Sequence, residues 1–290
     1  MKKICLILSI FAMAWFFTKA QNNDNLRIGL CLSGGGALGF AHIGAIKALE
    51  EHGIIPDEIS GASMGAIIGC FYAAGYTPEQ LLDIIVSKKM YKSSTIFSYI
   101  SGSLTKKTGL STHNVLRTVL REHVPGDSFA GLRKPFHLSV SNLFTGKCEI
   151  ISEGDSLDAW VAASASIPAV FESIIINGNT YIDGGVLNNM PAQPLAKNCN
   201  FIIGINVTPY LPSENYGTLD VLNLAIRMAQ NQNSEEGKAL CNHVIDVSAI
   251  TKYNEFSFQN YDLIYQYGYD AVEEYIKEHP EIDFISKNKK

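Results

Sequence analysis

The stretch LRIGLCLSGGGALGFAHIGAIKALEEHGIIPDEISGASMG, residues 26–65, carries the signals of a strand, a helix and a second strand. Its opening run LRIGLCLS is mainly apolar and enters a glycine cluster, which is typical of a buried strand in a parallel sheet. Apolar residues then recur near helical spacing from Phe40 to Leu49, and Gly53 follows where a left-handed helix cap is expected. Residues 56–61 supply the second strand. These signals predict a βαβ unit, in which a right-handed crossover joins two parallel strands.

Both glycine-rich turns of this unit are expected at one edge of the sheet. The loop Gly34–Gly36 follows the first strand, and the turn Gly61–Gly65 follows the second. Parallel strands bring such turns together at their carboxyl ends, where open α/β sheets bind ligands.

Strand and helix signals alternate along the rest of the chain. Helices are predicted near residues 64–74, 78–86, 112–122, 157–165, 219–229 and 260–278, and strands near 136–142, 149–152, 174–176, 180–183, 201–207 and 243–247. This alternation predicts one α/β domain with a mostly parallel sheet over residues 26–280.

The first twenty residues have the composition of a targeting segment. Lys2 and Lys3 precede an apolar run over residues 4–17, and Ala20 is the small residue that a signal peptidase favours. The apolar run is shorter than the roughly 20 residues that a membrane-spanning helix needs. We therefore predict a signal peptide over residues 1–20, with export to the periplasm or the medium.

Charge and cysteine content exclude several classes of protein. The formal net charge is −5, and it becomes −8 without residues 1–20, which hold three lysines and no acid. An acidic chain is a poor candidate for nucleic-acid binding, which needs a basic face. Five cysteines lie beyond residue 20, too dispersed for a disulfide scaffold or a zinc site: Cys31, Cys70, Cys148, Cys199 and Cys241. Cys199 and Cys241 each precede a predicted strand, and they would meet if those strands were neighbours.

Residues 87–108 lose all periodicity and mix lysines with aromatic side chains. The segment is expected to be a surface loop. The alternative is a lid or a flap that contacts a membrane or micelle, because cations and aromatic rings suit a lipid surface.

Ser63 is the candidate nucleophile. It is central in Gly61-Ala62-Ser63-Met64-Gly65, a G-x-S-x-G pattern that places a serine on a tight turn between a strand and a helix. The alternative is a helix start of small residues packed against a sheet.

The glycine loop is the second candidate element. Successive glycines before a helix expose N–H groups that bind negative charge, either an oxyanion or a phosphate. Gly34, Gly36 and Gly39 also satisfy the G-x-G-x-x-G pattern of dinucleotide sites, and Glu58 lies at the spacing of a ribose contact.

Asp183-Gly184-Gly185 after a later strand favours acyl transfer over dinucleotide binding. A nicotinamide-binding domain gives no reason for a serine turn or for this acidic turn. Acyl transfer needs all three stretches: a nucleophile, a carboxylate that accepts its proton, and N–H donors for the oxyanion.

Four stretches resemble, in the same order, the motif blocks of the patatin-like phospholipase family. They are SGGGALGFAHIG (33–44), GASMG (61–65), ASASIPAVF (163–171) and YIDGGVLNNMP (181–191). The resemblance implies a three-layer α/β/α sandwich and a Ser-Asp dyad that hydrolyses lipid esters, of the phospholipase A or lysophospholipase type, without a cofactor or metal.

Carried onto this chain, the resemblance makes Ser63 the nucleophile and Asp183 the general base. It implies an oxyanion loop of Gly34, Gly35 and Gly36, with motif support from Gly39, Gly61, Gly65, Gly184 and Gly185. The chain departs from the family at Leu38, where Arg or Lys is frequent.

Two alternatives to the dyad remain. His243 would complete a Ser-His-Asp triad after Asp183, whereas His42 is interpreted as a packing residue. Ser164 and Ser166 lack flanking glycines and are interpreted as supporting the pocket wall. The other alternative is a lipid-binding protein of the same fold with weak catalysis.

Overall fold

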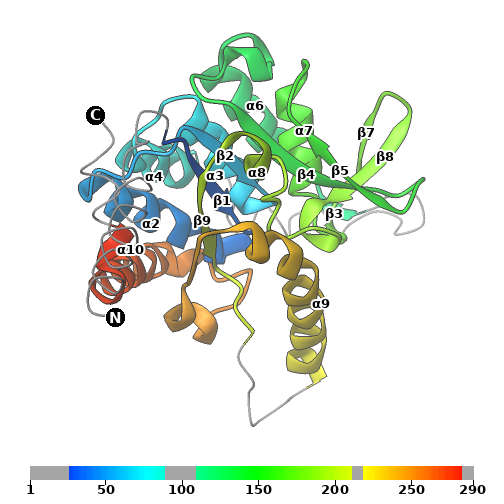
Figure 1. The fold of residues 1–290 in the computed structure, drawn as a ribbon. Coiled ribbons are helices and arrows are strands. Elements are labelled where there is room, and N and C mark those ends of the chain that lie inside the picture. The colour runs from blue at the N-terminus through cyan, green and yellow to red at the C-terminus, as the bar shows by residue number, and fades with distance from the viewer. Residues whose placement is uncertain (1–25, 89–108, 211–217, 283–290) are drawn as a thin grey trace, which may run out of the picture.

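The computed structural model describes residues 26–88, 109–210 and 218–282, and Figure 1 shows its fold. Within these residues, the main sheet has eight strands in the order β10-β9-β1-β2-β4-β8-β7, and β5 pairs with β4 outside this path. The strands are β1 (Ile28–Leu32), β2 (Glu58–Gly61), β4 (Phe136–Asn142), β5 (Lys147–Ile151), β7 (Ile174–Ile176), β8 (Asn179–Asp183), β9 (Phe201–Asn206) and β10 (His243–Asp246).

The sheet is mostly parallel, as predicted. Strands β10, β9, β1, β2 and β4 run parallel to one another, whereas β5 and β8 pair antiparallel with β4, and β7 pairs antiparallel with β8. Asn177 (φ 50°) and Gly178 (φ 80°) form the tight turn between β7 and β8, and an Asn-Gly pair favours such a hairpin.

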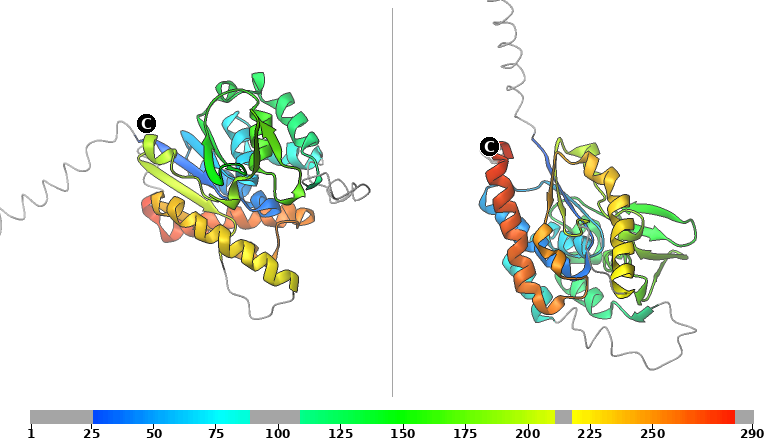
Figure 2. Two further views of the ribbon diagram at one scale, coloured as in Figure 1. Left: turned by 90° about the vertical axis from the view of Figure 1, so that its right-hand side faces the viewer. Right: turned by 90° about the horizontal axis from the view of Figure 1, so that it is seen from below.

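Helices cover both faces of the sheet, and Figure 2 shows α10 and α9 on opposite sides of the strands. The α-helices are α2 (Phe40–Glu51), α3 (Met64–Ala73), α4 (Pro78–Ser87), α6 (Asn114–His123), α7 (Leu157–Ser164), α8 (Leu195–Asn198), α9 (Thr218–Leu240) and α10 (Tyr261–Glu278). Short 3₁₀ helices are η1 (Gly36–Gly39), η2 (Pro125–Asp127), η3 (Phe129–Gly131), η4 (Gly184–Val186), η5 (Ser248–Lys252) and η6 (Phe258–Asn260).

The alternation of side chains along β1 divides the core into two unequal parts. Leu30 and Leu32 belong to the large apolar cluster on one face, together with residues of α2, α3 and α10. Cys31 points to the other face, where it joins a small cluster with Met190 and Leu195 of the α8 region. The sheet therefore lies between a thick and a thin helical layer, an α/β/α sandwich.

Some predicted elements differ from the structure. The helix expected at 219–229 extends from Thr218 to Leu240. The helix α8, which was not among the predicted helices, begins at Leu195, after the N–H of Ala192 has turned back to the carbonyl of Met190. A parallel pair, β3 (Gly109–Ser111) and β6 (Ala169–Phe171), was not predicted, since three residues are too few to show a period.

The strands after Cys199 and Cys241 are neighbours, which was the condition for the two cysteines to meet, yet both cysteines are free. Each thiol packs over a different glycine. A Cβ built on Gly29 would lie 3.2 Å from the sulfur of Cys199, and one on Gly204 would lie 3.0 Å from that of Cys241.

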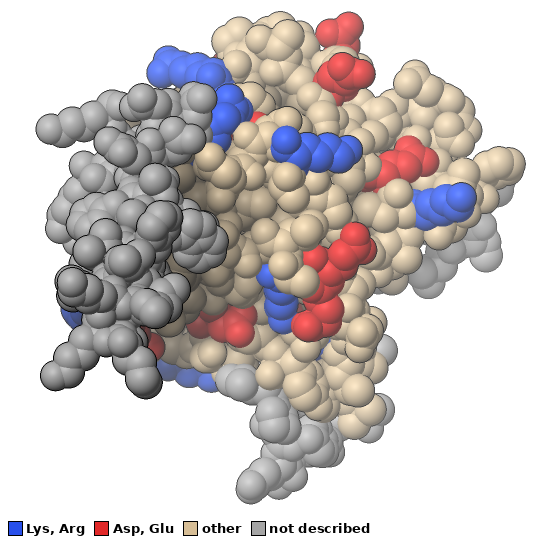
Figure 3. Space-filling view, viewed as in Figure 1, with Lys and Arg blue, Asp and Glu red and all other residues tan. Residues whose placement is uncertain are grey.

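Two predictions concern residues outside the described part of the chain. They are the signal peptide at 1–20 and most of the loop or lid at 87–108. Within the described ranges, no helix is both long enough and apolar enough to cross a membrane. On the face in Figure 3, basic side chains are scattered among acidic ones, and no continuous basic surface is visible there.

Candidate active site

Ser63 lies on a sharp turn between β2 and α3. Its backbone has φ 52° and ψ −122°, and only 5% of the residue is exposed. A Cβ on Gly61 would collide with the carbonyl oxygen of Gly65, and one on Gly65 would collide with that of Leu32. The turn therefore needs both glycines, and the positive φ of Ser63 stores backbone strain of about 1–3 kcal/mol.

Asp183 is brought to this turn by the antiparallel strand β8. Asp183 pairs with Val140 of β4, and β4 is the neighbour of β2. The Oγ of Ser63 donates a hydrogen bond of 2.6 Å to Oδ2 of Asp183, and the N–H of Gly185 donates one of 2.8 Å to Oδ1. The structure thus joins two residues that are 120 positions apart in the chain.

The carboxyl group of Asp183 has a raised pKa. Burial raises its pKa from 3.8 to about 7, although the hydrogen bonds from Ser63 and Gly185 lower it. A carboxylate with a pKa near neutrality both accepts and returns a proton at physiological pH, which is what a general base must do.

The end of α7 holds the backbone of both residues. The N–H of Ser63 donates to the Oγ of Ser164 at 3.0 Å, and the N–H of Asp183 donates to the carbonyl oxygen of Ser166 at 3.0 Å. Both serines are fully buried. The interpretation of this stretch as pocket wall was therefore incomplete, because Ser164 bonds directly to the backbone of Ser63.

The glycine loop lies against the Ser63 turn. A Cβ on Gly34 would lie 3.1 Å from the Cβ of Ser63, and one on Gly39 would collide with the side chain of Met64. The N–H of Gly34 bonds to the carbonyl oxygen of Asn189 at 3.3 Å. Within the described residues, the N–H groups of Gly35 and Gly36 have no such partner.

Leu38 brings no charge to this loop. It is fully buried in η1 and belongs to the large apolar cluster. Stabilisation of an oxyanion by the loop would therefore come from its backbone.

Glu58 is not placed to bind a ribose. It lies at the amino end of β2, the opposite end of the strand from Gly61, and is 1% exposed. Its carboxylate bonds to Arg27, His137 and Asn198. The spacing that suggested a dinucleotide site was misleading, because this carboxylate belongs to a buried polar network at the other edge of the sheet.

His243, the histidine of the triad alternative, lies elsewhere. His243 stands at the amino end of β10, and its Nδ1 lies 3.2 Å from the Oη of Tyr275. His42 is fully buried with Nε2 2.7 Å from the carbonyl oxygen of Ser33, and burial lowers its pKa to about 4. In the described part of the chain, no histidine bonds to Ser63 or Asp183.

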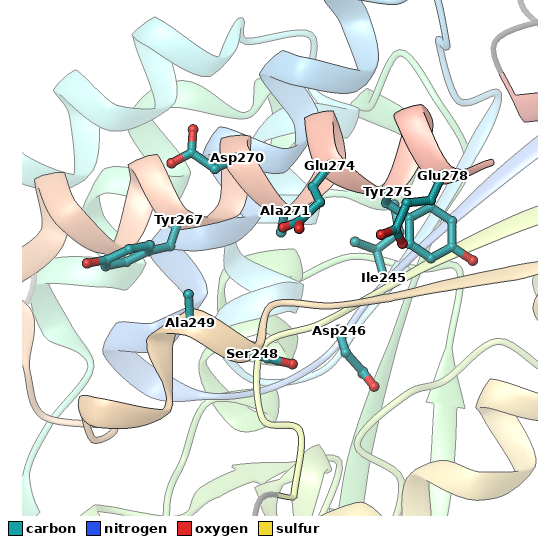
Figure 4. Close-up of a pocket in the computed structure, with 10 residues that line it drawn as sticks. All are labelled: Ile245, Asp246, Ser248, Ala249, Tyr267, Asp270, Ala271, Glu274, Tyr275 and Glu278. Carbon is teal, nitrogen blue, oxygen red and sulfur yellow. The ribbon is translucent and has the colours of Figure 1, made fainter. Parts of the chain in front are cut away.

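Other polar clusters are separate from Ser63. A cavity of about 240 Å³ lies between β10 and α10, and Figure 4 shows the carboxylates of Asp246, Asp270, Glu274 and Glu278 among its lining residues. One group in the described ranges brings metal-ligand atoms within 4.8 Å of one another: His243, His279 and Glu281. Neither cluster contains Ser63, Asp183 or a residue of the glycine loop, and His243 is the residue of the triad alternative.

Comparison with known proteins gives matches in sequence and in fold. A family model described as patatin-like phospholipase matches residues 30–196. An uncharacterized NTE family protein of Mycobacterium tuberculosis is 31% identical over 215 residues, which cover 72% of this chain and 58% of that protein. A lysophospholipase, NTE1 of Eremothecium gossypii, is 32% identical over 211 residues, which cover 65% of this chain and 13% of that protein.

The fold also has a counterpart among solved structures. VipD from Legionella pneumophila matches with a TM-score of 0.52 at 16% sequence identity, over 88% of this chain and 67% of that chain. At this identity the match concerns the fold alone. The chain thus spans little more than half the length of the mycobacterial relative and a small part of the lysophospholipase.

Proposed function

Because the chain belongs to the patatin-like phospholipase family, we propose that it is a lipid acyl hydrolase with Ser63 as nucleophile and Asp183 as general base. The observation that carries this proposal is the 2.6 Å hydrogen bond from Ser63 Oγ to Asp183 Oδ2. The family match and the lysophospholipase relatives support the reaction class, and the dyad rests on this geometry.

The first half of the proposed reaction forms an acyl-enzyme. Ser63 Oγ attacks the ester carbonyl carbon while its proton passes to Asp183 Oδ2. The carbonyl oxygen becomes an oxyanion and accepts hydrogen bonds from the N–H groups of Gly35 and Gly36. When the tetrahedral intermediate collapses, the alcohol leaves with the proton from Asp183.

The second half releases the acid. A water molecule gives a proton to Asp183 and attacks the acyl carbon. The second tetrahedral intermediate expels Ser63 Oγ, which takes the proton back from Asp183, and the fatty acid departs. Asp183 returns to its ionised form with no net gain or loss of protons.

The proposed loop has two donors, although the family resemblance implied three glycines. Gly34 already uses its N–H in the bond to Asn189. Its part is to let the loop approach Ser63, since a side chain on Gly34 would lie 3.1 Å from the Cβ of Ser63.

The proposed substrates are phospholipids or lysophospholipids, by analogy with the lysophospholipase relatives. Exposed apolar side chains beside the site support contact with a lipid surface. Val186 and Leu187 follow Asp183 closely and are 42% and 39% exposed. Asn233 of α9 donates a hydrogen bond to the carbonyl oxygen of Val186, so α9 lies beside these exposed side chains. Export through the segment at 1–20 belongs to this proposal as well.

The test is covalent labelling of Ser63 by a fluorophosphonate, followed by turnover of phospholipids, lysophospholipids and a soluble nitrophenyl ester. The wild type should be labelled and should hydrolyse ester, whereas Ser63→Ala should do neither. A folded wild-type protein that is not labelled and binds lipid without turnover would instead support the non-catalytic alternative.

A further inference from the structure

Asn189 lies where the parts of the site meet, although it was not among the predicted site residues. It is fully buried, and its carbonyl oxygen accepts the N–H of Gly34. Its own N–H donates to Asn233 Oδ1 at 2.9 Å, and its Nδ2 donates to Thr208 Oγ1 at 3.1 Å. One residue thus joins the glycine loop, helix α9 and the segment after β9.

The side-chain oxygen of Asn189 occupies the space over two glycines. A Cβ built on Gly34 or on Gly185 would lie 2.5 Å from this Oδ1. The same position on Gly34 is 3.1 Å from the Cβ of Ser63, and that on Gly185 is 3.1 Å from Asp183 Oδ1. The amide oxygen therefore separates the glycine loop from the turn that carries the base, and it faces the carboxylate across Gly185.

The side-chain oxygen of Asn189 destabilises the folded state. Asn189 Oδ1 is buried and has no hydrogen-bond partner among the described residues. A buried acceptor without a partner destabilises a fold, and such groups persist in native proteins where they have another use.

We propose that Asn189 is a positioning residue, which fixes the distance between the oxyanion loop and the Asp183 turn through its side-chain amide. The inference rests on the proposed function, because it assigns a role in the same reaction. The backbone bond to Gly34 and the bond to Thr208 anchor the residue on both sides, and its oxygen sets how closely Gly34 and Gly185 approach.

The side-chain amide of Asn189 is neutral, which suits a position near the carboxylate of Asp183. The pKa of Asp183 depends on burial and on the bonds from Ser63 and Gly185, with no charged side chain among its causes. A carboxylate at position 189 would lie across Gly185 from the carboxylate of Asp183, and a like charge nearby raises the pKa of a carboxyl group further. An apolar residue of similar size would lose the bond to Thr208.

The experiment compares Asn189→Asp and Asn189→Ala with a matched control, Asn188→Asp. Asn188→Asp introduces the same change one residue away, at a side-chain amide that donates a hydrogen bond to Oε1 of Gln193. We expect Asn189→Asp to move the pH midpoint of fluorophosphonate labelling upward by about one unit or more, while Asn188→Asp leaves it in place. We expect Asn189→Ala to lower kcat for a soluble nitrophenyl ester by about tenfold or more with little change in KM.

Thr208→Val provides a second route if the variants at 189 fail to fold. It removes the acceptor of the Asn189 amide without altering any residue of the dyad or loop, and kcat should fall several-fold at unchanged KM. The inference is wrong if the wild type is active and the folded variants keep its kcat and its pH midpoint. A wild type that is neither labelled nor active would instead refute the proposed function.

Discussion

The backbone N–H of Ser63 donates a 3.0 Å hydrogen bond to the side-chain oxygen of Ser164, which lies 101 residues later in the chain. The proposed nucleophile has a positive φ, so its conformation depends on such external support. A second serine, outside the G-x-S-x-G pattern, thus helps to hold the first.

Ser164→Ala should impair the nucleophile. The change leaves the buried N–H of Ser63 without an acceptor, which costs about 1–3 kcal/mol, and kcat should fall about tenfold as Ser63 loses its fixed position. Labelling rate and ester turnover measure the effect. Ser166→Ala is the matched control, because it keeps the carbonyl that Asp183 uses and loses only the hydroxyl bond to Ala162. Equal effects of the two changes would contradict this account.

Asp183→Asn should abolish ester hydrolysis, by about a thousandfold or more, because an amide cannot take the proton of Ser63. The variant should remain folded, since the amide nearly matches the carboxyl group in shape. Turnover of a soluble nitrophenyl ester, together with circular dichroism, checks both statements. Substantial activity in the folded variant would exclude Asp183 as the base.

Activity should rise with pH through the pKa of Asp183, which burial raises to about 7. The base acts in its ionised form, so kcat/KM for a soluble ester should lose about tenfold for each unit below that value. A profile from pH 5 to 9 measures the midpoint. A midpoint near 4 would show that burial does not control this group.

Stability should change with pH in the opposite direction. Between about pH 4 and 7 the folded protein keeps the proton on Asp183 while the unfolded chain releases it, so the free energy of unfolding falls as pH rises. The full shift of the pKa corresponds to about 4 kcal/mol. Urea unfolding should show this loss in the wild type, and Asp183→Asn should not show it. The same slope in both proteins would assign it to other groups.

His243→Ala should leave catalysis nearly unchanged, within about twofold, because the ring lies at the amino edge of the sheet beside Tyr275 and Phe201. The lost ring contacts should instead lower the free energy of unfolding by about 1–2 kcal/mol. Ester turnover and urea unfolding measure the two effects. Near-complete loss of turnover in a folded protein would support the Ser-His-Asp triad instead of the dyad.

Helix α9 should contribute to lipid binding. Val221 and Met228 lie seven residues apart on one helical face and are 54% and 53% exposed. Replacing both with Gln should weaken binding to phosphatidylcholine vesicles by about tenfold, since burial of apolar area drives such binding, and should spare soluble ester turnover. The matched control replaces Leu143 and Phe144, exposed on the turn between β4 and β5. Equal losses from both pairs would exclude a specific role for α9.

The alternation of strand and helix signals was enough to predict the sheet, and the serine turn and the acidic turn, together with the family resemblance, were enough to predict the two residues that meet. This is because each feature depends on local backbone chemistry, such as the glycines at 61 and 65 that the turn requires. The carboxyl edge of parallel strands then brings the turns together.

What the sequence could not show depends on long-range contacts. The engagement of the Gly34 N–H by Asn189 is set by how the segment after β8 folds back over the loop. Glu58 had the right spacing for one function, but its position at the amino end of β2 became clear only from strand bounds. The short pair of β3 and β6 has no period to recognise.

The separation of Ser63 and Asp183 along the chain has a consequence for the order of folding events. Their hydrogen bond spans 120 residues, and it requires both the pairing of β2 with β4 and the pairing of β4 with β8. Contacts of such long range form slowly because closing the loop costs entropy. A partly folded chain therefore has a serine without its base, and reactivity toward a fluorophosphonate during refolding would report the moment at which the sheet is complete.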